Sequence, residues 1–235
     1  IPFSTVEAYK SFRTALSFVI STYDSRIVAM TSANPSEGKS VTVANLAVAV
    51  AQTDKKVLLI DADMRKPVQH KCFRLSNKVG LSDVITGDKP LDKALNRNVT
   101  GSLDVLTSGT IPPNPSELLA SRQMKELLET LKERYDMILI DCAPINVVSD
   151  VAGLSQEIAG VVMVVHYGST TYPELDDAVN RLALANCNVL GFAVNEVSSK
   201  HGSGYNYKYK YKYKYDYQYG SAKQAEEKEK AGSAC

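Results

Sequence analysis

The chain has 235 residues, of which 44% are hydrophobic and 23% charged, and its formal net charge is +1. This length and composition are those of an ordinary globular protein with room for one α/β domain and a tail. The small net charge excludes attraction of the whole molecule to nucleic acid or to an anionic membrane, so any such attraction must be local.

The cysteines favour a reducing compartment. Cys72, Cys142, Cys187 and Cys235 form no C-x-x-C pair and have no metal-ligand spacing, and Cys142 and Cys187 lie in apolar stretches where burial is expected. We therefore expect a cytoplasmic protein. No apolar run approaches the ~18–20 residues that span a bilayer. Because the chain begins at Ile1 without Met, we expect it to be a piece of something longer.

The first 22 residues predict an amphipathic helix. Ser4 and Glu7 have the spacing of a capping box, and apolar residues at positions 6, 12, 15, 16, 19 and 20 fall on one face. The other face carries Glu7, Lys10 and Arg13, three residues apart. This charged face is either simply solvated or an interaction surface, and the helix alone does not decide between the two.

Residues 27–40, IVAMTSANPSEGKS, predict a buried strand that runs through a tight turn into a helix start. Backbone N–H groups at such a turn converge on an anion. The phosphate-loop template G-x-x-x-x-G-K-[ST] is met except at Ala33. Lys39 would neutralise the β- and γ-phosphates, and the Ser40 hydroxyl would bind Mg²⁺. The residues predicted to bind nucleotide here are Asn34, Pro35, Ser36, Glu37, Gly38, Lys39, Ser40 and Val41.

A helix over 41–52 and a strand over 57–60 follow, and the strand ends in Asp61 and Asp63. Ionised groups at the end of a buried strand are costly unless they are solvated or paired, so they favour a ligand. Beside a phosphate loop that ligand would be Mg²⁺ with the γ-phosphate. The alternative for Asp61 is a plain strand-end cap.

Residues 67–109 are predicted to cover the surface of the domain and to take no part in its chemistry. Short helices are expected at 81–85 and 91–95 and a strand at 103–106. The prolines of 111–115 force an extended loop. Helices over 116–120 and 121–134 follow, the second with Met124, Leu127, Leu128 and Leu131 directed inward.

The strand predicted at 137–140 ends in Asp141, the Walker B pattern in which a carboxylate holds the Mg²⁺ shell. A strand at 160–165, a helix at 173–185 and a strand at 189–194 complete the pattern, and Asn195 follows the last strand. Strands alternating with helices predict an α/β fold of the P-loop NTPase type, with a mostly parallel sheet covered by helices on both faces. The phosphate loop and both aspartates would then share one sheet edge.

The composition changes at Ser198, so we predict a nucleotide-binding domain over 1–198 and a flexible tail over 199–235. The tail has a tyrosine at every second position: Tyr205, Tyr207, Tyr209, Tyr211, Tyr213, Tyr215, Tyr217 and Tyr219. It could be a β-strand, a grip for single-stranded nucleic acid, or a set of phosphorylation substrates. An ATP site on the same chain favours the third possibility, in which the tail tyrosines are phosphorylation substrates.

Taken together, these segments resemble the bacterial tyrosine kinases of capsule and exopolysaccharide assembly, the BY-kinases. The resemblance rests on residues 33–40, the DADMRKP segment at 61–67, the aspartate-ended strand at 138–141 and the tyrosine cluster. The EAYKSFRT segment at 7–14 and the NPSELL segment at 114–119 match as well. It covers roughly residues 5–219, nearly the whole chain.

The resemblance implies a function and roles for the site residues. It implies an ATP- and Mg²⁺-dependent protein-tyrosine kinase that autophosphorylates its tyrosine tail. Asp61 would polarise or deprotonate the tyrosine hydroxyl, Asp63 and Asp141 would organise Mg²⁺, and Lys39 and Ser40 would hold phosphate and metal. Asn195 would lie beside the adenine, by similarity to related ATPases.

The resemblance also implies partners and a location. We expect a homo-oligomeric ring, with an octamer as one candidate size, formed through Glu7, Lys10 and Arg13. We further expect tyrosine-containing protein substrates, no nucleic-acid partner, and a membrane-bound polysaccharide co-polymerase as activator. The chain would then lie at the inner face of the plasma membrane, held there by this partner or by a missing N-terminal part.

Departures from related patterns separate the candidate classes. The family often has Gly where Ser36 stands, and Arg where Lys10 stands, and a lysine supplies no planar two-point donor. Partition and cell-division ATPases, the rival class, carry Lys immediately after the first loop position, where this chain has Asn34. Asn34 and the tyrosine tail therefore argue against that class. A nucleic-acid-binding ATPase that uses the Tyr/Lys tail is the remaining alternative.

Overall fold

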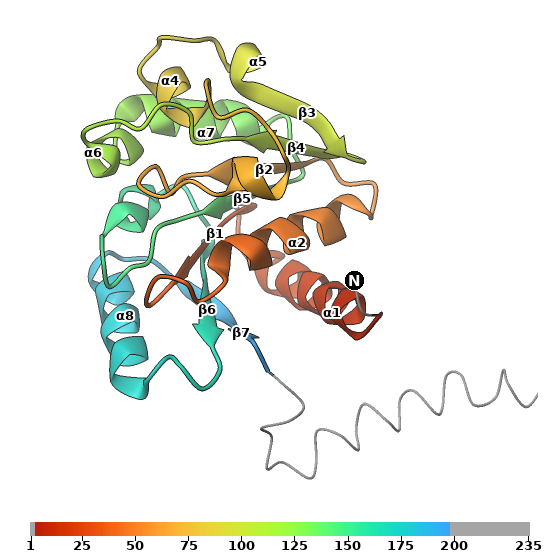
Figure 1. The fold of residues 1–235 in the computed structure, drawn as a ribbon, viewed down its shortest axis with the longest axis vertical. Coiled ribbons are helices and arrows are strands. Elements are labelled where there is room, and N and C mark those ends of the chain that lie inside the picture. Colours follow the sequence, from red (N-terminus) through yellow and green to blue (C-terminus); the bar gives the residue numbers. More distant parts are fainter. Residues whose placement is uncertain (1–2, 198–235) are drawn as a thin grey trace, which may run out of the picture. The chain divides into compact units, whose positions relative to one another are not determined.

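The computed structural model describes residues 3–197, and within these, residues 3–195 belong to one compact unit (Figure 1). The tail tyrosines, Cys235 and the predicted boundary at 198 lie outside the described residues. The strands are β1 (Ile27–Ser32), β2 (Val57–Asp61), β3 (Leu95–Thr100), β4 (Leu103–Leu106), β5 (Met137–Asp141), β6 (Gly160–His166) and β7 (Val189–Asn195). They form one sheet in the order β3-β4-β2-β5-β1-β6-β7.

All neighbouring strands of this sheet are parallel except β3 and β4, which are antiparallel. The helices are α1 (Phe3–Ile20), α2 (Lys39–Ala51), α3 (Gln69–Cys72), α4 (Leu81–Ile85), α5 (Leu91–Ala94), α6 (Pro115–Leu119), α7 (Arg122–Lys132), α8 (Tyr172–Leu184) and the 3₁₀ helix η1 (Asp150–Leu154). The predicted α/β fold with a mostly parallel sheet is therefore confirmed.

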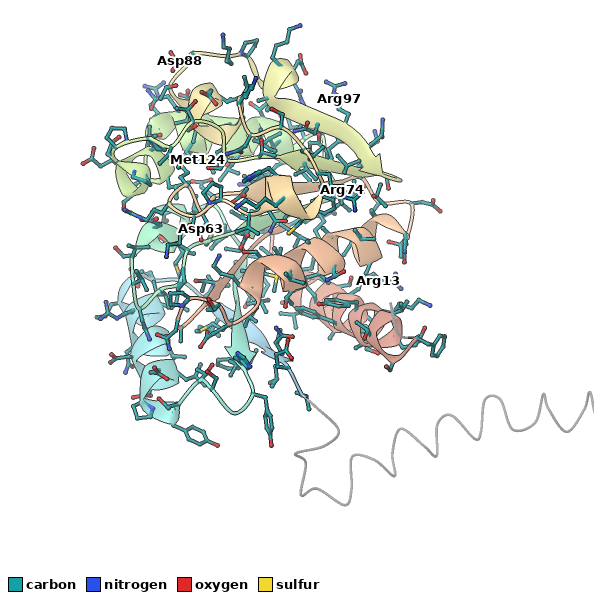
Figure 2. All side chains as sticks on the ribbon, in the orientation of Figure 1. Arg13, Asp63, Arg74, Asp88, Arg97 and Met124 are labelled. Carbon is teal, nitrogen blue, oxygen red and sulfur yellow. The ribbon has the colours of Figure 1, made fainter. Side chains whose placement is uncertain are left out.

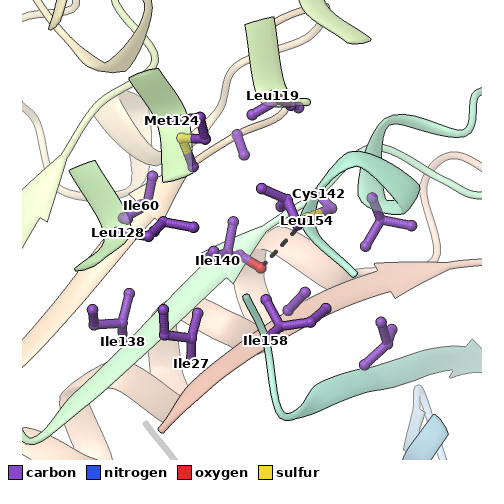
Figure 3. Close-up of a cluster of buried hydrophobic side chains, with 14 of the residues drawn as sticks. Ile27, Ile60, Leu119, Met124, Leu128, Ile138, Ile140, Cys142, Leu154 and Ile158 are labelled. Atoms are coloured by element: carbon purple, nitrogen blue, oxygen red, sulfur yellow. Dashed lines mark hydrogen bonds between the residues drawn. The ribbon is translucent and has the colours of Figure 1, made fainter. Parts of the chain in front are cut away.

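Both faces of the sheet are buried, because the apolar residues of each central strand alternate between two clusters. Along β1, for example, Ile27 and Ala29 enter one cluster, while Val28 and Met30 enter the other. Helices α1 and α2 cover the second face. Helices α4, α7, α8 and η1 cover the first, where Met124 and Leu128 of α7 lie over the isoleucines of the sheet (Figure 3).

Cys142 and Cys187 are buried, as expected from their apolar surroundings. Of the residues predicted to face inward on α7, Met124, Leu128 and Leu131 are buried, and Leu127 is partly buried against the same cluster. No helix within residues 3–197 is long and apolar enough to cross a membrane.

Two local predictions were wrong. Helix α1 already includes Phe3, so Ser4 lies in its first turn and is not an N-cap. The segment 95–100 was not recognised as a strand, because its sequence, LNRNVT, is mostly polar. It pairs with β4 at the sheet edge, where half of its residues are exposed and no apolar alternation is needed.

Candidate functional site

The turn between β1 and α2 has the backbone of an anion-binding loop. Gly38 is the N-cap of α2 with φ +88°, in the left-handed region that favours glycine. A Cβ built on Gly38 would lie 2.0 Å from Nδ2 of Asn195, so any side chain here would force Asn195 to move. Ser36, at φ +68°, adopts the same left-handed conformation without being glycine. Glycine would adopt this backbone conformation without the steric cost that serine carries.

The phosphate loop is held in place by Glu37, whose side chain is buried. Its Oε2 accepts a hydrogen bond from the Asn34 backbone N–H at 3.2 Å, and its Oε1 accepts one from the Thr170 hydroxyl at 2.6 Å. The backbone N–H of His166 donates to the same hydroxyl at 3.0 Å. The connection between β6 and α8 thus fixes the loop through one carboxylate.

Asn195, at the end of β7, contacts the phosphate loop directly. Its Nδ2 donates to the carbonyl oxygen of Glu37 at 3.2 Å. The predicted place of Asn195 beside the adenine stays a prediction. The contact does place the residue at the loop that would hold the phosphates.

The predicted convergence of the strand-end carboxylates is present. Strands β2 and β5 are parallel neighbours, with Asp61 in register with Asp141. The Lys39 ammonium lies 2.9 Å from Oδ2 of Asp63 and 3.4 Å from Oδ1 of Asp141, and it donates to the Ser40 hydroxyl at 3.1 Å. Figure 2 shows Asp63 at this edge of the sheet. The phosphate-loop lysine and both acidic segments therefore form a single site.

Lys39 remains charged in this environment. Burial by itself would lower the pKa of its ammonium, but the neighbouring Asp141 and Asp63 outweigh burial and raise it. A buried cation paired with two carboxylates is a suitable group to meet a polyphosphate, which offers it further negative oxygens.

Asp61 is completely buried, and its two oxygens differ. Oδ2 accepts hydrogen bonds from the backbone N–H groups of Val68 at 3.0 Å and Gln69 at 2.9 Å. Oδ1 has no donor among the described residues. Burial, and then the charge of Asp141, raise the pKa of Asp61 to about 7. Such a carboxyl group gains and loses a proton near neutral pH, which suits the predicted role of a base.

The segment that follows Pro67 is part of this site, so the prediction that 67–109 provides only surface cover was wrong. Nε2 of Gln69 donates to Oδ2 of Asp141 at 2.7 Å and to the carbonyl oxygen of Ser40 at 3.0 Å. The only sequence signal for Gln69 was its closeness to the DADMRKP segment. Its partners lie 29 and 72 positions away, which spacing alone does not reveal.

The NPSELL segment, which had no assigned role, contacts the DADMRKP segment. Arg65, of the DADMRKP segment, donates to Asp150 and to the Ser116 hydroxyl of the NPSELL segment. The Ser116 hydroxyl in turn donates to Asp150 at 2.5 Å. These contacts tie the loop after β2 to α6 and η1.

The oxygen donors of the site fit a magnesium ion. Mg²⁺ beside phosphates takes one or two carboxylates and keeps several waters. The Ser40 hydroxyl with Asp63 and Asp141 provides such hard donors, while Asp61 Oδ1 is a buried acceptor that receives no hydrogen bond within residues 3–197. Within residues 3–197, no group of three or more His, Cys, Asp or Glu side chains is arranged to hold a metal ion by itself.

The charged face of α1 is engaged within the chain. Lys10 pairs with Glu7 at 2.8 Å on the surface, whereas Nη1 of Arg13 donates to the Ala49 carbonyl oxygen near the end of α2 at 2.7 Å. Figure 2 shows Arg13 between the two helices. Arg13 therefore has a structural contact in its own chain, and the predicted oligomer interface stays a prediction.

Comparison with known proteins identifies relatives of the chain. The family model described as "AAA domain" matches residues 25–170. Tyrosine-protein kinase YwqD of Bacillus subtilis (strain 168) is 44% identical over 196 residues, which cover 83% of this chain and 83% of YwqD. Tyrosine-protein kinase etk of Escherichia coli (strain K12) is 37% identical over 203 residues, 86% of this chain.

The matched region is only 28% of the length of etk, so the chain spans about a quarter of that relative. The solved kinase domain of Escherichia coli tyrosine kinase ETK superposes with a TM-score of 0.77 at 36% identity. The superposition covers 85% of this chain and 80% of that domain.

Proposed function

Because this chain belongs to the family of bacterial tyrosine-protein kinases, we propose that it transfers the γ-phosphoryl group of ATP to tyrosine hydroxyls, first of all those of its own tail. The observation that carries this proposal is the convergence of Lys39 and Ser40 with the carboxylates of Asp63 and Asp141 at one sheet edge. Phosphoryl transfer depends mainly on positioning and on neutralising charge, which this arrangement provides.

In the proposed reaction, the tyrosine oxygen forms a bond to the γ-phosphorus while the bond from that phosphorus to the β-bridging oxygen breaks, and ADP leaves. Lys39 neutralises charge on the phosphates, and the backbone N–H groups at the start of α2 face them. The tyrosine proton passes to Asp61. Oδ1 is the oxygen free to take it, because Oδ2 already accepts two backbone hydrogen bonds.

The metal in this proposal would be held by Ser40, Asp63 and Asp141. When bound, Mg²⁺ neutralises phosphate charge and helps to align the reacting group. Glu37 keeps the phosphate loop in shape, and Gln69 keeps Asp61 and Asp141 in place.

The acceptors would be the eight tyrosines at odd positions from 205 to 219, which lie outside the described residues. This segment carries four lysines and one aspartate, a formal charge of +3. Each phosphate adds about −1.5 to −2 charges, so two phosphates already cancel or reverse the charge of the segment. The tail of one subunit would therefore change its attraction to a neighbouring subunit as it is modified.

We further propose that the chain works in trans within a homo-oligomeric ring, with Glu7, Lys10 and Arg13 at the contacts and an octamer as one candidate size. Its place would be the cytoplasmic face of the membrane, beside a membrane-bound polysaccharide co-polymerase that activates it. The process served would be capsule or exopolysaccharide synthesis and export. Support comes from the family resemblance of the motifs.

Mass spectrometry of the purified chain after incubation with Mg·ATP tests the kinase proposal. We expect phosphate on tail tyrosines in the wild type and in the control Lys55→Met, a change of an exposed lysine. The variants Lys39→Met and Asp61→Ala should form no phosphotyrosine. ATP hydrolysis without phosphotyrosine in the wild type would instead favour an ATPase, and persistent phosphotyrosine in Lys39→Met would contradict the assigned site.

Native mass spectrometry before and after ATP tests the ring proposal separately. Large assemblies should convert to small ones as the tail is phosphorylated, and a Lys39→Met ring should stay intact. An assembly size that is the same in both states would contradict regulation through the tail.

A further inference from the structure

Gln69, the first residue of α3, joins three elements of the site. Its side-chain Nε2 donates to the Ser40 carbonyl oxygen on α2 and to Asp141 Oδ2 on β5, and its backbone N–H donates to Asp61 Oδ2 on β2. The residue is fully buried. Lys39 contacts the other oxygen of the Asp141 carboxylate, Oδ1, and the Ser40 hydroxyl interacts with the carboxylate as well.

The orientation of the Gln69 amide follows from its partners. A carbonyl oxygen accepts hydrogen bonds only, and so does an ionised carboxylate, so the NH₂ group must face both of them. Its Oε1 is then left buried without a donor among the described residues. Leaving a buried acceptor unpaired is unfavourable, and an apolar side chain would avoid this cost. Packing alone therefore does not account for a glutamine at this place.

We propose that Gln69 is a positioning residue for the phosphoryl transfer, which fixes the rotamers of Asp141 and Asp61 and so sets how the site takes up magnesium with the nucleotide. This inference rests on the proposed function. Asp63 is independent of Gln69, because its Oδ1 accepts from the Lys66 backbone N–H and its Oδ2 contacts Lys39. Loss of the Gln69 side chain should thus remove one of the contacts that orient Asp141, while its contact with Lys39 and the Lys39–Asp63 pair stay in place.

The test compares Gln69→Met with wild type. Methionine keeps the length of the side chain and removes both Nε2 donors, while the backbone contact to Asp61 is retained. The matched control is Gln123→Met, at an exposed position of α7. Affinity for a non-hydrolysable ATP analogue is measured by calorimetry, once with Mg²⁺ and once with a chelator, and kcat and KM are measured with ATP.

Wild type and the control should bind the analogue more tightly with Mg²⁺. In Gln69→Met we expect this tightening to fall by about 10- to 100-fold, the usual effect of removing a residue that orients metal ligands. Affinity in the chelator should stay within about twofold, and kcat should fall more than KM rises. A Mg²⁺-dependent tightening equal to that of wild type would overturn the proposal.

Two outcomes need separate readouts. If Gln69→Met does not fold, as judged by circular dichroism, Gln69→Asn keeps the amide at a shorter reach and should show a smaller loss of tightening; an unchanged tightening overturns the proposal. If the wild type forms no phosphotyrosine and Gln69→Met still loses the tightening, the kinase function is wrong while the positioning role of Gln69 stands.

Discussion

Arg65 and Asp150 form a two-point ion pair, with Nε 3.1 Å from Oδ2 and Nη2 3.2 Å from Oδ1. The Asp150 side chain is fully buried, whereas 40% of the Arg65 side chain is exposed. Arg65 thus lies at the surface, and its positive charge neutralises the negative charge of the buried Asp150 carboxylate. Planar two-point pairing of this kind is specific to arginine.

Replacing Arg65 should therefore be costly. Within residues 3–197, Arg65→Ala leaves the Ser116 hydroxyl as the one recorded side-chain partner of Asp150. We expect a loss of about 1–3 kcal/mol in the free energy of unfolding, with Arg65→Lys recovering part of it. Urea unfolding measures this loss. Arg97→Ala, which removes an exposed partner of Asp92, is the control and should cost no more than about 1 kcal/mol. Equal losses in the two variants would contradict the role of the buried pair.

Asp61→Asn should change how stability depends on pH. The folded-state pKa of about 7 exceeds the unfolded value of about 3.9, so protonation of Asp61 stabilises the fold fully below about pH 4, and this contribution is lost as pH rises to about 7. Asparagine does not titrate. The stability of Asp61→Asn relative to wild type should therefore increase between pH ~4 and ~7, by about 2–4 kcal/mol, and then level off.

Denaturant unfolding at several pH values measures this difference. Asp54→Asn, an exposed change at a positive φ that asparagine tolerates, serves as the control. If the stability difference between Asp61→Asn and wild type does not depend on pH, the pKa of the Asp61 carboxyl group is not raised in the folded protein.

Ser36 holds a left-handed backbone, and the chemistry of its side chain should matter less than its conformation. Ser36→Gly should change stability by less than about 1 kcal/mol and keep nucleotide affinity, because the relief of strain and the added freedom of the unfolded chain offset each other. Ser36→Val should cost about 1–2 kcal/mol and weaken nucleotide binding. Thermal unfolding and calorimetry measure both, with Ser169→Val at an exposed loop position as control.

Thr170→Val removes the hydroxyl that joins Glu37 to the His166 backbone while keeping the shape of the side chain. We expect a loss of about 1–2 kcal/mol in stability and a higher KM for ATP, with kcat changed less, because the phosphate loop loses a support rather than a reacting group. Steady-state kinetics measure this split. Thr130→Val, on the exposed side of α7, should leave both constants unchanged.

The sheet and much of the site could be predicted from sequence. The central strands are short apolar runs with clear ends, and parallel strands must place their carboxyl ends together, so the meeting of Asp61 and Asp141 follows from the order of elements. Strand β3 could not be found in this way. Its pairing with β4 is a tertiary contact at an edge, and its sequence carries no apolar pattern.

Contacts between segments that are distant in the sequence could not be predicted either. Gln69 and Thr170 are polar residues in irregular or short segments, and nothing in their own neighbourhood marks them as buried or as partners of the site. Their roles depend on which loop the fold brings beside them. The same holds for Arg65, whose motif was recognised although its partner, Asp150, was not.

The position of the site in the sheet has a consequence for local stability. The phosphate loop, Asp61 and Asp141 follow β1, β2 and β5, which are adjacent strands in the middle of the sheet, whereas Asn195 ends the edge strand β7. Backbone amides at sheet edges exchange with solvent through small local openings, while central strands open only with most of the molecule. Hydrogen exchange should therefore be slowest in the strands that carry the phosphate-binding and acidic groups. The contact of Asn195 with Glu37 should be the first part of the site to open.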